Sequence, residues 1–184
     1  MIIAITGTPG TGKTSVSNLL EKKGFTVVDL NKIVVEKNFV LKYDKKRDSK
    51  IVDVVKLDNY IKKKYSKKDL IFVEGHLSHL LKCVDKVIVI RMHPGRLSKN
   101  LEKKGWSKDK IKENLEAEIL DVILCEAVDN HSQNNVFEIN ATDNSLDDLA
   151  EIIIKIIEKR FKNMKKYKIG KIDWSEEILK DFKL

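Results

Sequence analysis

The sequence contains no long apolar segment. No uninterrupted run approaches the ~20 apolar residues with which a helix crosses a bilayer, so we expect no membrane contact. The first residues also lack a basic stretch followed by a long apolar one, and we therefore predict no secretory signal peptide. Together, these absences favour a cytoplasmic protein.

Cysteine is also scarce, because Cys83 and Cys125 are the only two among 184 residues. Both lie in apolar segments, and their separation does not match the spacing of metal-binding motifs. We expect both to be buried, reduced thiols, which is consistent with the cytoplasm.

Arginine is rare although the chain is basic. The formal net charge is +8, yet only four of the 36 basic residues are arginine, namely Arg47, Arg91, Arg96 and Arg160. A positive charge of this size indicates either a lysine-rich solvated surface or a partner that carries phosphate groups. Planar guanidinium groups are the usual clamps for phosphate oxygens, so few such clamps are available here.

Glycine is not abundant either, with eight in the chain, but three of them fall between residues 7 and 14. This stretch, GTPGTGKT, matches the phosphate-binding loop (Walker A) pattern G-x-x-x-x-G-K-[ST] without departure. It follows the apolar run 2–5, which predicts a buried strand, and it precedes a helix predicted over 13–23. Strand, glycine loop and helix in this order are what phosphate binding requires, whereas a merely flexible glycine turn is the alternative.

The loop predicts ATP and Mg²⁺ as cofactors. Its glycines would let successive backbone N–H groups surround an anion, and the N-terminus of the following helix adds positive potential. Lys13 is expected to reach the β- and γ-phosphates, Thr14 to hold the Mg²⁺, and Ser15 to bind an α-phosphate oxygen. The full set of predicted ATP-binding residues in the loop is Gly7, Gly10, Thr11, Gly12, Lys13, Thr14 and Ser15.

Apolar runs alternate with helical patterns along the rest of the chain. We predict five buried strands, at 2–5, 25–28, 70–75, 86–91 and 136–140. We predict helices at 13–23, 30–39, 53–64, 94–103, 108–130 and 145–166, and a polar loop at 42–50. Strands that alternate with helices form a parallel sheet covered on both faces, so the predicted fold class is α/β.

A carboxylate ends the third predicted strand. A phosphate-binding enzyme of this type needs an acidic group at the end of a second core strand, close to the magnesium. Glu74 in the stretch LIFVEGH takes this place, although an ordinary acid at a strand end is the alternative. His76 is expected to orient the attacking water or a phosphate group. His76 and His79 form an HxxH pair, but this pair alone is a weak signal, and we predict no zinc site.

Four stretches in this order resemble a known family: GTPGTGKTS, YDKKRDSKIVD, VEGH and KKGWSKDKIKENLEAEI. The family is that of the archaeal and nuclear adenylate kinases of isoenzyme-six type, also known as coilin-interacting nuclear ATPases, and the likeness covers most of residues 1–160. The resemblance implies a P-loop nucleoside monophosphate kinase domain over 1–168 with sheet order 2-3-1-4-5. It further implies a monophosphate-binding arm at about 30–53, a short lid at about 104–114 and a tail at 169–184.

The chain departs from the family pattern at several positions. The family's Asp-x-His falls on Glu74 and His76, so a glutamate stands where an aspartate is usual. In the lid, Lys104 stands where the family usually has arginine, and Asn100 takes the place of another arginine, whereas Arg91 matches a family arginine. By resemblance, the catalytic residues are Lys13, Glu74 and His76, Lys104 binds ATP, and Thr14 and Glu74 hold Mg²⁺, partly through water.

The resemblance implies adenylate kinase activity, which converts ATP and AMP into two ADP, and also ATPase activity. The acceptor is AMP or another nucleoside monophosphate. A kinase with few arginine clamps and an imperfect lid would admit water and hydrolyse ATP. In the arm, four residues match the family pattern, although they are also the expected solvated partners of nearby lysines: Tyr43, Asp44, Asp48 and Asp53.

The resemblance also implies a role in maturation of the small ribosomal subunit, with a ribosomal platform protein, universal protein S eleven, as partner. The stretch 155–171 holds eight basic residues and one acid, and it is either a contact with rRNA or a solvated helix face. We expect Trp174 to pack on the domain. The alternative function is an ATP-switched module for nucleic-acid binding or assembly with little kinase activity.

Overall fold

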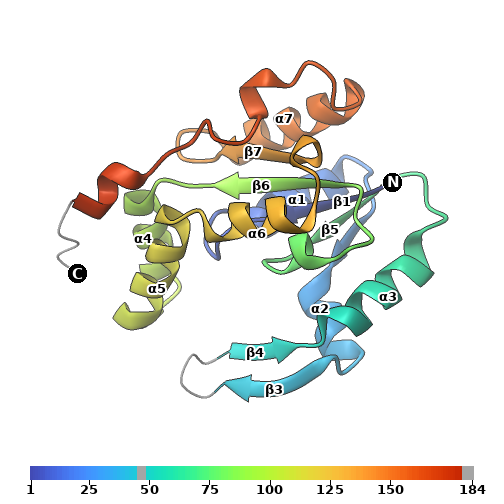
Figure 1. Cartoon of the computed structure of the whole chain (residues 1–184), viewed down its shortest axis with the longest axis horizontal. Helices are drawn as coiled ribbons and strands as arrows, with labels where there is room; N and C mark the ends of the chain where they lie inside the picture. Colours follow the sequence, from blue (N-terminus) through green and yellow to red (C-terminus); the bar gives the residue numbers. More distant parts are fainter. Residues whose placement is uncertain (45–48, 180–184) are drawn as a thin grey trace.

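A five-stranded parallel sheet forms the centre of the computed structural model, which describes residues 1–44 and 49–179 (Figure 1). The strands are β1 (Ile2–Thr6), β2 (Val27–Asp29), β5 (Ile71–Glu74), β6 (Lys86–Arg91) and β7 (Val136–Asn140). Their order is β2-β5-β1-β6-β7, and every neighbouring pair is parallel. Both the predicted α/β class and the order 2-3-1-4-5 are therefore confirmed.

Helices cover both faces of this sheet because successive residues of a strand point to opposite faces. Ile3 and Ile5 of β1 pack in one apolar cluster, and Ile2 and Ala4 pack in another. The first cluster lies under α1 (Lys13–Lys22), α4 (Pro94–Glu102), α5 (Lys108–Ile119) and α7 (Leu146–Glu158). The second lies under α2 (Leu30–Glu36), α3 (Val54–Tyr65) and α6 (Val122–Asn130). This two-sided cover explains the uninterrupted apolar strands.

The prediction of a polar loop over 42–50 is wrong for the residues of this stretch that the structure describes, 42–44 and 49–50. The structure has an antiparallel pair there, β3 (Val40–Asp44) and β4 (Ser49–Val52), which projects from the sheet domain (Figure 1). Leu41, Tyr43 and Ile51 are exposed on it, so this hairpin lacks the buried face that produces an alternating apolar pattern. A strand without a buried face has no hydrophobic period to be recognised.

The single helix predicted over 108–130 is two helices, α5 and α6. The break lies at Asp121, whose φ of 56° is left-handed and whose carboxylate accepts a hydrogen bond from Arg91. The helix predicted over 145–166 ends at Glu158 instead, because Arg160 and Phe161 also take left-handed φ values and turn the chain back. Phe161 then packs against Phe137 at a ring-centroid distance of 5.3 Å.

The two cysteines differ in exposure. Cys83 is half-buried, and burial raises its pKa to about 12. Cys125 is exposed, so the prediction that it is buried is wrong. Its helix α6 turns Leu124 and Ala127 toward the sheet, which leaves Cys125 on the outer side. No helix within residues 1–44 and 49–179 is long and apolar enough to span a membrane.

The segment after α7 crosses the far edge of the sheet and ends beside α4 and α5 (Figure 1). Lys168 forms an antiparallel bridge with Phe137 of β7. The backbone N–H groups of Lys171 and Ile172 donate to the carboxylate of Glu138 at 2.5 and 3.0 Å. Trp174 meets the ring of His93 edge-on at 5.0 Å, which confirms that this tryptophan packs on the domain.

Candidate functional site

The glycine loop joins β1 to α1 and follows a path that requires glycine at several positions. Gly7 and Gly10 have φ values of 142° and 97°, which residues with a side chain rarely adopt. A Cβ atom on Gly7 would lie 2.3 Å from the carbonyl oxygen of Ile90. One on Gly10 would lie 2.9 Å from side-chain atoms of Leu97 and Leu101. The loop is therefore pressed against the end of β6 and against α4.

A cavity of about 620 Å³ opens above this loop. The structure brings together there most of the residues that the sequence predicts for the site: Gly10, Thr11, Gly12, Lys13, Thr14, Ser15, Glu74, His76 and Lys104 all line it. Gly7 lies below, at the base of the loop, where it is buried. The roles assigned to these residues stay predictions, but their gathering in one cavity is a property of the fold.

Lys13 is the buried cation of the cavity. Its ammonium donates to the carbonyl oxygens of Gly7 at 2.8 Å and Thr8 at 3.0 Å, and the residue is only 7% exposed. Burial lowers the pKa of Lys13 to about 8, although the carboxylate of Glu74 works in the opposite direction. A buried ammonium with an incomplete set of partners favours the arrival of an anion.

Oxygen ligands converge beside Lys13. The Thr14 hydroxyl donates to Glu74 at 3.2 Å, and Asp29 of β2 stands opposite Glu74 in the strand register. Burial raises the pKa of Glu74, and the charge of Asp29 acts in the same direction. In the described part of the chain, no three His, Cys, Asp or Glu residues form a metal cluster. The Thr14 hydroxyl and the carboxylates of Glu74 and Asp29 fit Mg²⁺, which keeps waters and uses one or two carboxylates together with phosphate oxygens.

The two histidines of the HxxH pair have different surroundings. His76 lines the cavity wall, where the surrounding protein reduces hydration of its ring and so lowers its pKa, and the charges of Lys13 and His79 act in the same direction. A neutral ring at pH 7 follows. His79 is buried, with Nδ1 at 2.9 Å from the Thr6 hydroxyl and Nε2 at 2.9 Å from Glu126. Both of its ring nitrogens thus have partners within the protein.

Comparison with known proteins agrees with this geometry. The family described as an AAA domain matches residues 3–121. A Pyrococcus furiosus protein named "Putative adenylate kinase" is 41% identical over 183 residues, which cover 97% of this chain and 96% of the relative. A Methanocaldococcus jannaschii protein of the same name is 38% identical over 178 residues, with 96% and 94% covered.

The chain belongs to the adenylate kinase family. Among solved structures, shikimate kinase from Acinetobacter baumannii superposes with a TM-score of 0.61 over 86% of this chain and 93% of that one, at 16% identity. Shikimate kinase from Bacteroides thetaiotaomicron gives 0.58 over 86% and 98%, at 14% identity. At these identities the likeness concerns the fold, which is that of P-loop kinases.

Helix α4 of this adenylate kinase family member supplies a wall of the cavity that the sequence did not reveal in full. Arg96 and Asn100 of α4 line the cavity from this side, and so do Lys103 and Lys104 directly after the helix. The side-chain amide of Asn100 donates to the carbonyl oxygen of Gly10 at 3.0 Å, so it braces the loop and does not act as a free phosphate clamp. The spacing of Arg96 and Asn100 could have predicted that both line the cavity, because residues four apart share a helix face.

Three more cavity features were missed. Leu146 is 42% exposed at the start of α7, and it lines the cavity together with Asn144. Asn31 lines the opposite side. Asp29 does not line this cavity but lies opposite Glu74 in the strand register, and it carried a usable signal, because it directly follows a predicted buried strand. Leu146 carried none, because an apolar residue in an amphipathic helix is normally part of the core.

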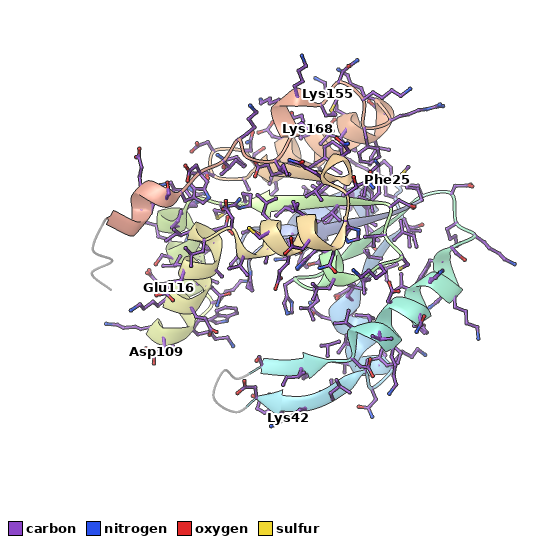
Figure 2. The ribbon with its side chains drawn as sticks, viewed as in Figure 1. Phe25, Lys42, Asp109, Glu116, Lys155 and Lys168 are labelled. Atoms are coloured by element: carbon purple, nitrogen blue, oxygen red, sulfur yellow. The ribbon has the colours of Figure 1, made fainter. Side chains whose placement is uncertain are left out.

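None of the three described residues that match the family pattern in the arm, Tyr43, Asp44 and Asp53, lines the cavity. Tyr43 is exposed on β3, and Asp44 ends that strand. Asp53 caps α3, because its carboxylate accepts the backbone N–H of Lys56 at 3.0 Å. Asp48 lies outside the described residues. Figure 2 shows Lys42 on the hairpin and Asp109 and Glu116 on α5, as side chains of two well-separated elements.

Proposed function

We propose that this protein is a nucleoside monophosphate kinase of isoenzyme-six type that transfers the γ-phosphate of ATP to AMP and so forms two ADP. The observation that carries this proposal is the cavity in which a glycine loop, a buried lysine and a Thr14–Glu74 pair meet. The names of the archaeal relatives support the same reaction class. The ordered set of four sequence motifs supports the narrower assignment.

ATP would occupy the cavity with its phosphates on the loop. Backbone N–H groups and the N-terminus of α1 would hold the phosphate oxygens. Lys13 would exchange the carbonyls of Gly7 and Thr8 for the β- and γ-phosphates, where its charge stabilises the transferred group. Leu146 and Asn144 offer an apolar and a polar surface to the base.

Thr14 and Glu74 would hold Mg²⁺, with Asp29 in reach of its water shell. When bound, this ion neutralises charge on the phosphates. Glu74 is one methylene longer than the usual aspartate, and its contact with Thr14 keeps its carboxylate at the loop. The ion therefore fits the donors that these three residues supply.

The acceptor would enter from the side of α2 and the β3–β4 hairpin, where Asn31 and His76 line the cavity. On this proposal, residues 30–53 are the monophosphate arm, residues 104–114 are the lid, and both belong to a domain over 1–168 with a tail at 169–184. His76, neutral at pH 7, would orient the acceptor phosphate or a water by hydrogen bonding. Lys104 would reach the ATP phosphates from the lid side.

ATP hydrolysis would accompany transfer. Lys104 supplies a positive charge but cannot bind two phosphate oxygens at once as an arginine does. The side-chain amide of Asn100 already donates to the carbonyl oxygen of Gly10. A lid with so few clamps would exclude water incompletely, and water would then compete with AMP.

The second candidate function is an ATP-switched assembly factor in the cytoplasm that acts in maturation of the small ribosomal subunit. It would bind the platform protein, universal protein S eleven, and contact rRNA. The basic stretch 155–171 favours it, because most of its basic side chains are exposed. Lys155 and Lys168, labelled in Figure 2, lie far from the hairpin, on the opposite side of the sheet domain. Such a surface would leave the nucleotide cavity free.

Incubation with ATP and Mg²⁺, with and without AMP, separates these functions when ADP is followed by chromatography. The kinase forms ADP much faster when AMP is present. The ATPase forms ADP without AMP. Absence of ADP in both reactions, together with salt-sensitive RNA binding, would contradict the kinase and favour the assembly factor.

A further inference from the structure

A buried arginine lies directly behind the glycine loop. Arg91, at the end of β6, is 1% exposed. Its Nε donates to Glu118 at 2.8 Å, and one terminal nitrogen donates to the backbone carbonyl of Glu118 at 3.0 Å and to the carboxylate of Asp121. The other terminal nitrogen is 3.6 Å from Glu138. Arg91 does not line the cavity, so it acts only through its partners.

Glu118 connects this arginine to the loop. Its carboxylate is 2% exposed and meets donors on both oxygens. Oε1 accepts from Arg91 and from the backbone N–H of Met92 at 3.0 Å, and Oε2 accepts from the Thr8 hydroxyl at 2.5 Å. A carboxylate can accept at all three contacts, whereas an amide would keep the contact with Thr8 only by donating to its hydroxyl oxygen.

Thr8 is the point at which this contact enters the site. Its side chain points away from the cavity toward Glu118, and the residue is 1% exposed. Its carbonyl oxygen accepts from the ammonium of Lys13 at 3.0 Å and from the Thr11 hydroxyl at 2.9 Å. Glu118 therefore holds, through the Thr8 hydroxyl, the residue whose carbonyl oxygen accepts from Lys13.

We propose that Glu118 is a positioning residue for phosphoryl transfer, which holds the loop through the Thr8 hydroxyl in the shape that accepts the phosphates, while Arg91 orients Glu118. This assignment rests on the proposed function. A loop with three glycines in eight residues has many accessible conformations. Without an anchor, ATP binding would have to order it, and the cost of ordering would reduce affinity. Because Glu118 lies on α5, the anchor also ties the loop to the helix whose first half belongs to the proposed lid.

The decisive variant is Thr8→Val, which removes the hydroxyl and keeps the shape of the side chain. We expect the Kd for ATP with Mg²⁺ to rise about tenfold, since a hydrogen bond to a charged group is lost. Thr8→Ser restores the hydroxyl and should bind within about twofold of the wild type. Thr6→Val is the matched control, because it removes a buried threonine hydroxyl two residues earlier that contacts His79 and the backbone carbonyl of His76 and does not contact Glu118.

Glu118→Gln tests the other end of the contact, because its amide can only donate to the Thr8 hydroxyl and so replaces a charge-assisted hydrogen bond with a neutral one. The double variant Thr8→Val/Glu118→Gln should bind ATP no more weakly than the weaker single variant, because both variants alter the same contact. If Glu118→Gln does not fold, Thr8→Val and Thr8→Ser decide the question. Urea unfolding of each variant, measured in parallel, separates a loss of stability from a loss of affinity.

Unchanged ATP affinity in Thr8→Val, with a loss of stability like that of Thr6→Val, would overturn the assignment and leave Glu118 a structural residue only. Additive losses in the double variant would overturn it as well. A wild-type protein that binds ATP but transfers no phosphate to AMP would contradict the proposed reaction and leave the affinity test of Glu118 intact. A wild-type protein that bound no ATP would overturn both.

Discussion

Replacement of Lys13 by methionine is expected to stabilise the nucleotide-free protein at neutral pH while it removes turnover. Burial lowers the pKa of Lys13 from 10.5 to about 8, which corresponds to about 3 kcal/mol against the charged form in the folded state. Methionine removes this cost and also the two hydrogen bonds to Gly7 and Thr8, each worth about 1 kcal/mol. At pH 7, Lys13→Met should therefore raise the free energy of unfolding by about 1 kcal/mol.

This gain should depend on pH. The pKa of Lys13 is lower in the native protein than in the unfolded chain, so between about pH 8 and pH 10.5 the unfolded chain retains this proton more than the native protein does. Stability rises with pH wherever the unfolded state binds more protons. The wild type therefore gains stability relative to the variant across this window. The advantage of Lys13→Met is complete below pH 8 and should be lost or reversed near pH 10.

Urea unfolding of both proteins at pH 7 and pH 10, without nucleotide, measures this difference. Other lysines and tyrosines titrate in both proteins, so they cancel in the comparison. Lys112→Met makes the same chemical change at an exposed position of α5 and should alter stability little at either pH. An equal difference between wild type and Lys13→Met at both pH values would refute the account of a buried, weakened ammonium.

Three further outcomes follow from the geometry. Glu74→Gln should reduce Mg²⁺-dependent ADP formation about 100-fold, yet unfold at nearly the same urea concentration, because burial already disfavours the Glu74 carboxylate and raises its pKa. Gly7→Ala should lose about 2 kcal/mol or more of stability, since its Cβ would lie 2.3 Å from the carbonyl oxygen of Ile90; a wild-type melting curve would contradict the loop path. A thiol reagent at pH 8 should label exposed Cys125 rapidly and Cys83 slowly, because burial raises the pKa of Cys83 to about 12. Mass spectrometry of peptides measures the order, and labelling of Cys83 before Cys125 would contradict this prediction.

The sheet and the loop could be predicted because their signals are local. Each core strand is an apolar run buried on both faces, and such runs need no knowledge of their neighbours. The loop pattern is equally local, since its glycines permit the backbone conformation of the loop and its lysine and threonine lie at fixed positions after them. The strand order itself came from the family resemblance, because apolar runs alone do not distinguish one parallel order from another.

The parts that could not be predicted depend on tertiary contacts. The apolar spacing continues through Asp121, and only its contact with Arg91 explains why the chain breaks between α5 and α6. The exposed hairpin gives no period because it buries no face. Arg96 and Leu146 belong to the cavity only because α4 and the start of α7 meet above the loop, and that meeting is a property of the whole fold.

The docking of the final segment on β7 has a practical consequence for anyone who shortens this protein. Glu138 is 1% exposed and takes the N–H groups of Lys171 and Ile172. A chain cut after Gly170 would leave this carboxylate buried without those two donors. It would also uncover the part of β7 beyond the Lys168–Phe137 bridge, and an uncovered outer strand is a template for self-association. Trimming of the C-terminus for crystallisation or tagging should therefore begin beyond the last docked turn, and removal of the whole segment should yield aggregated material.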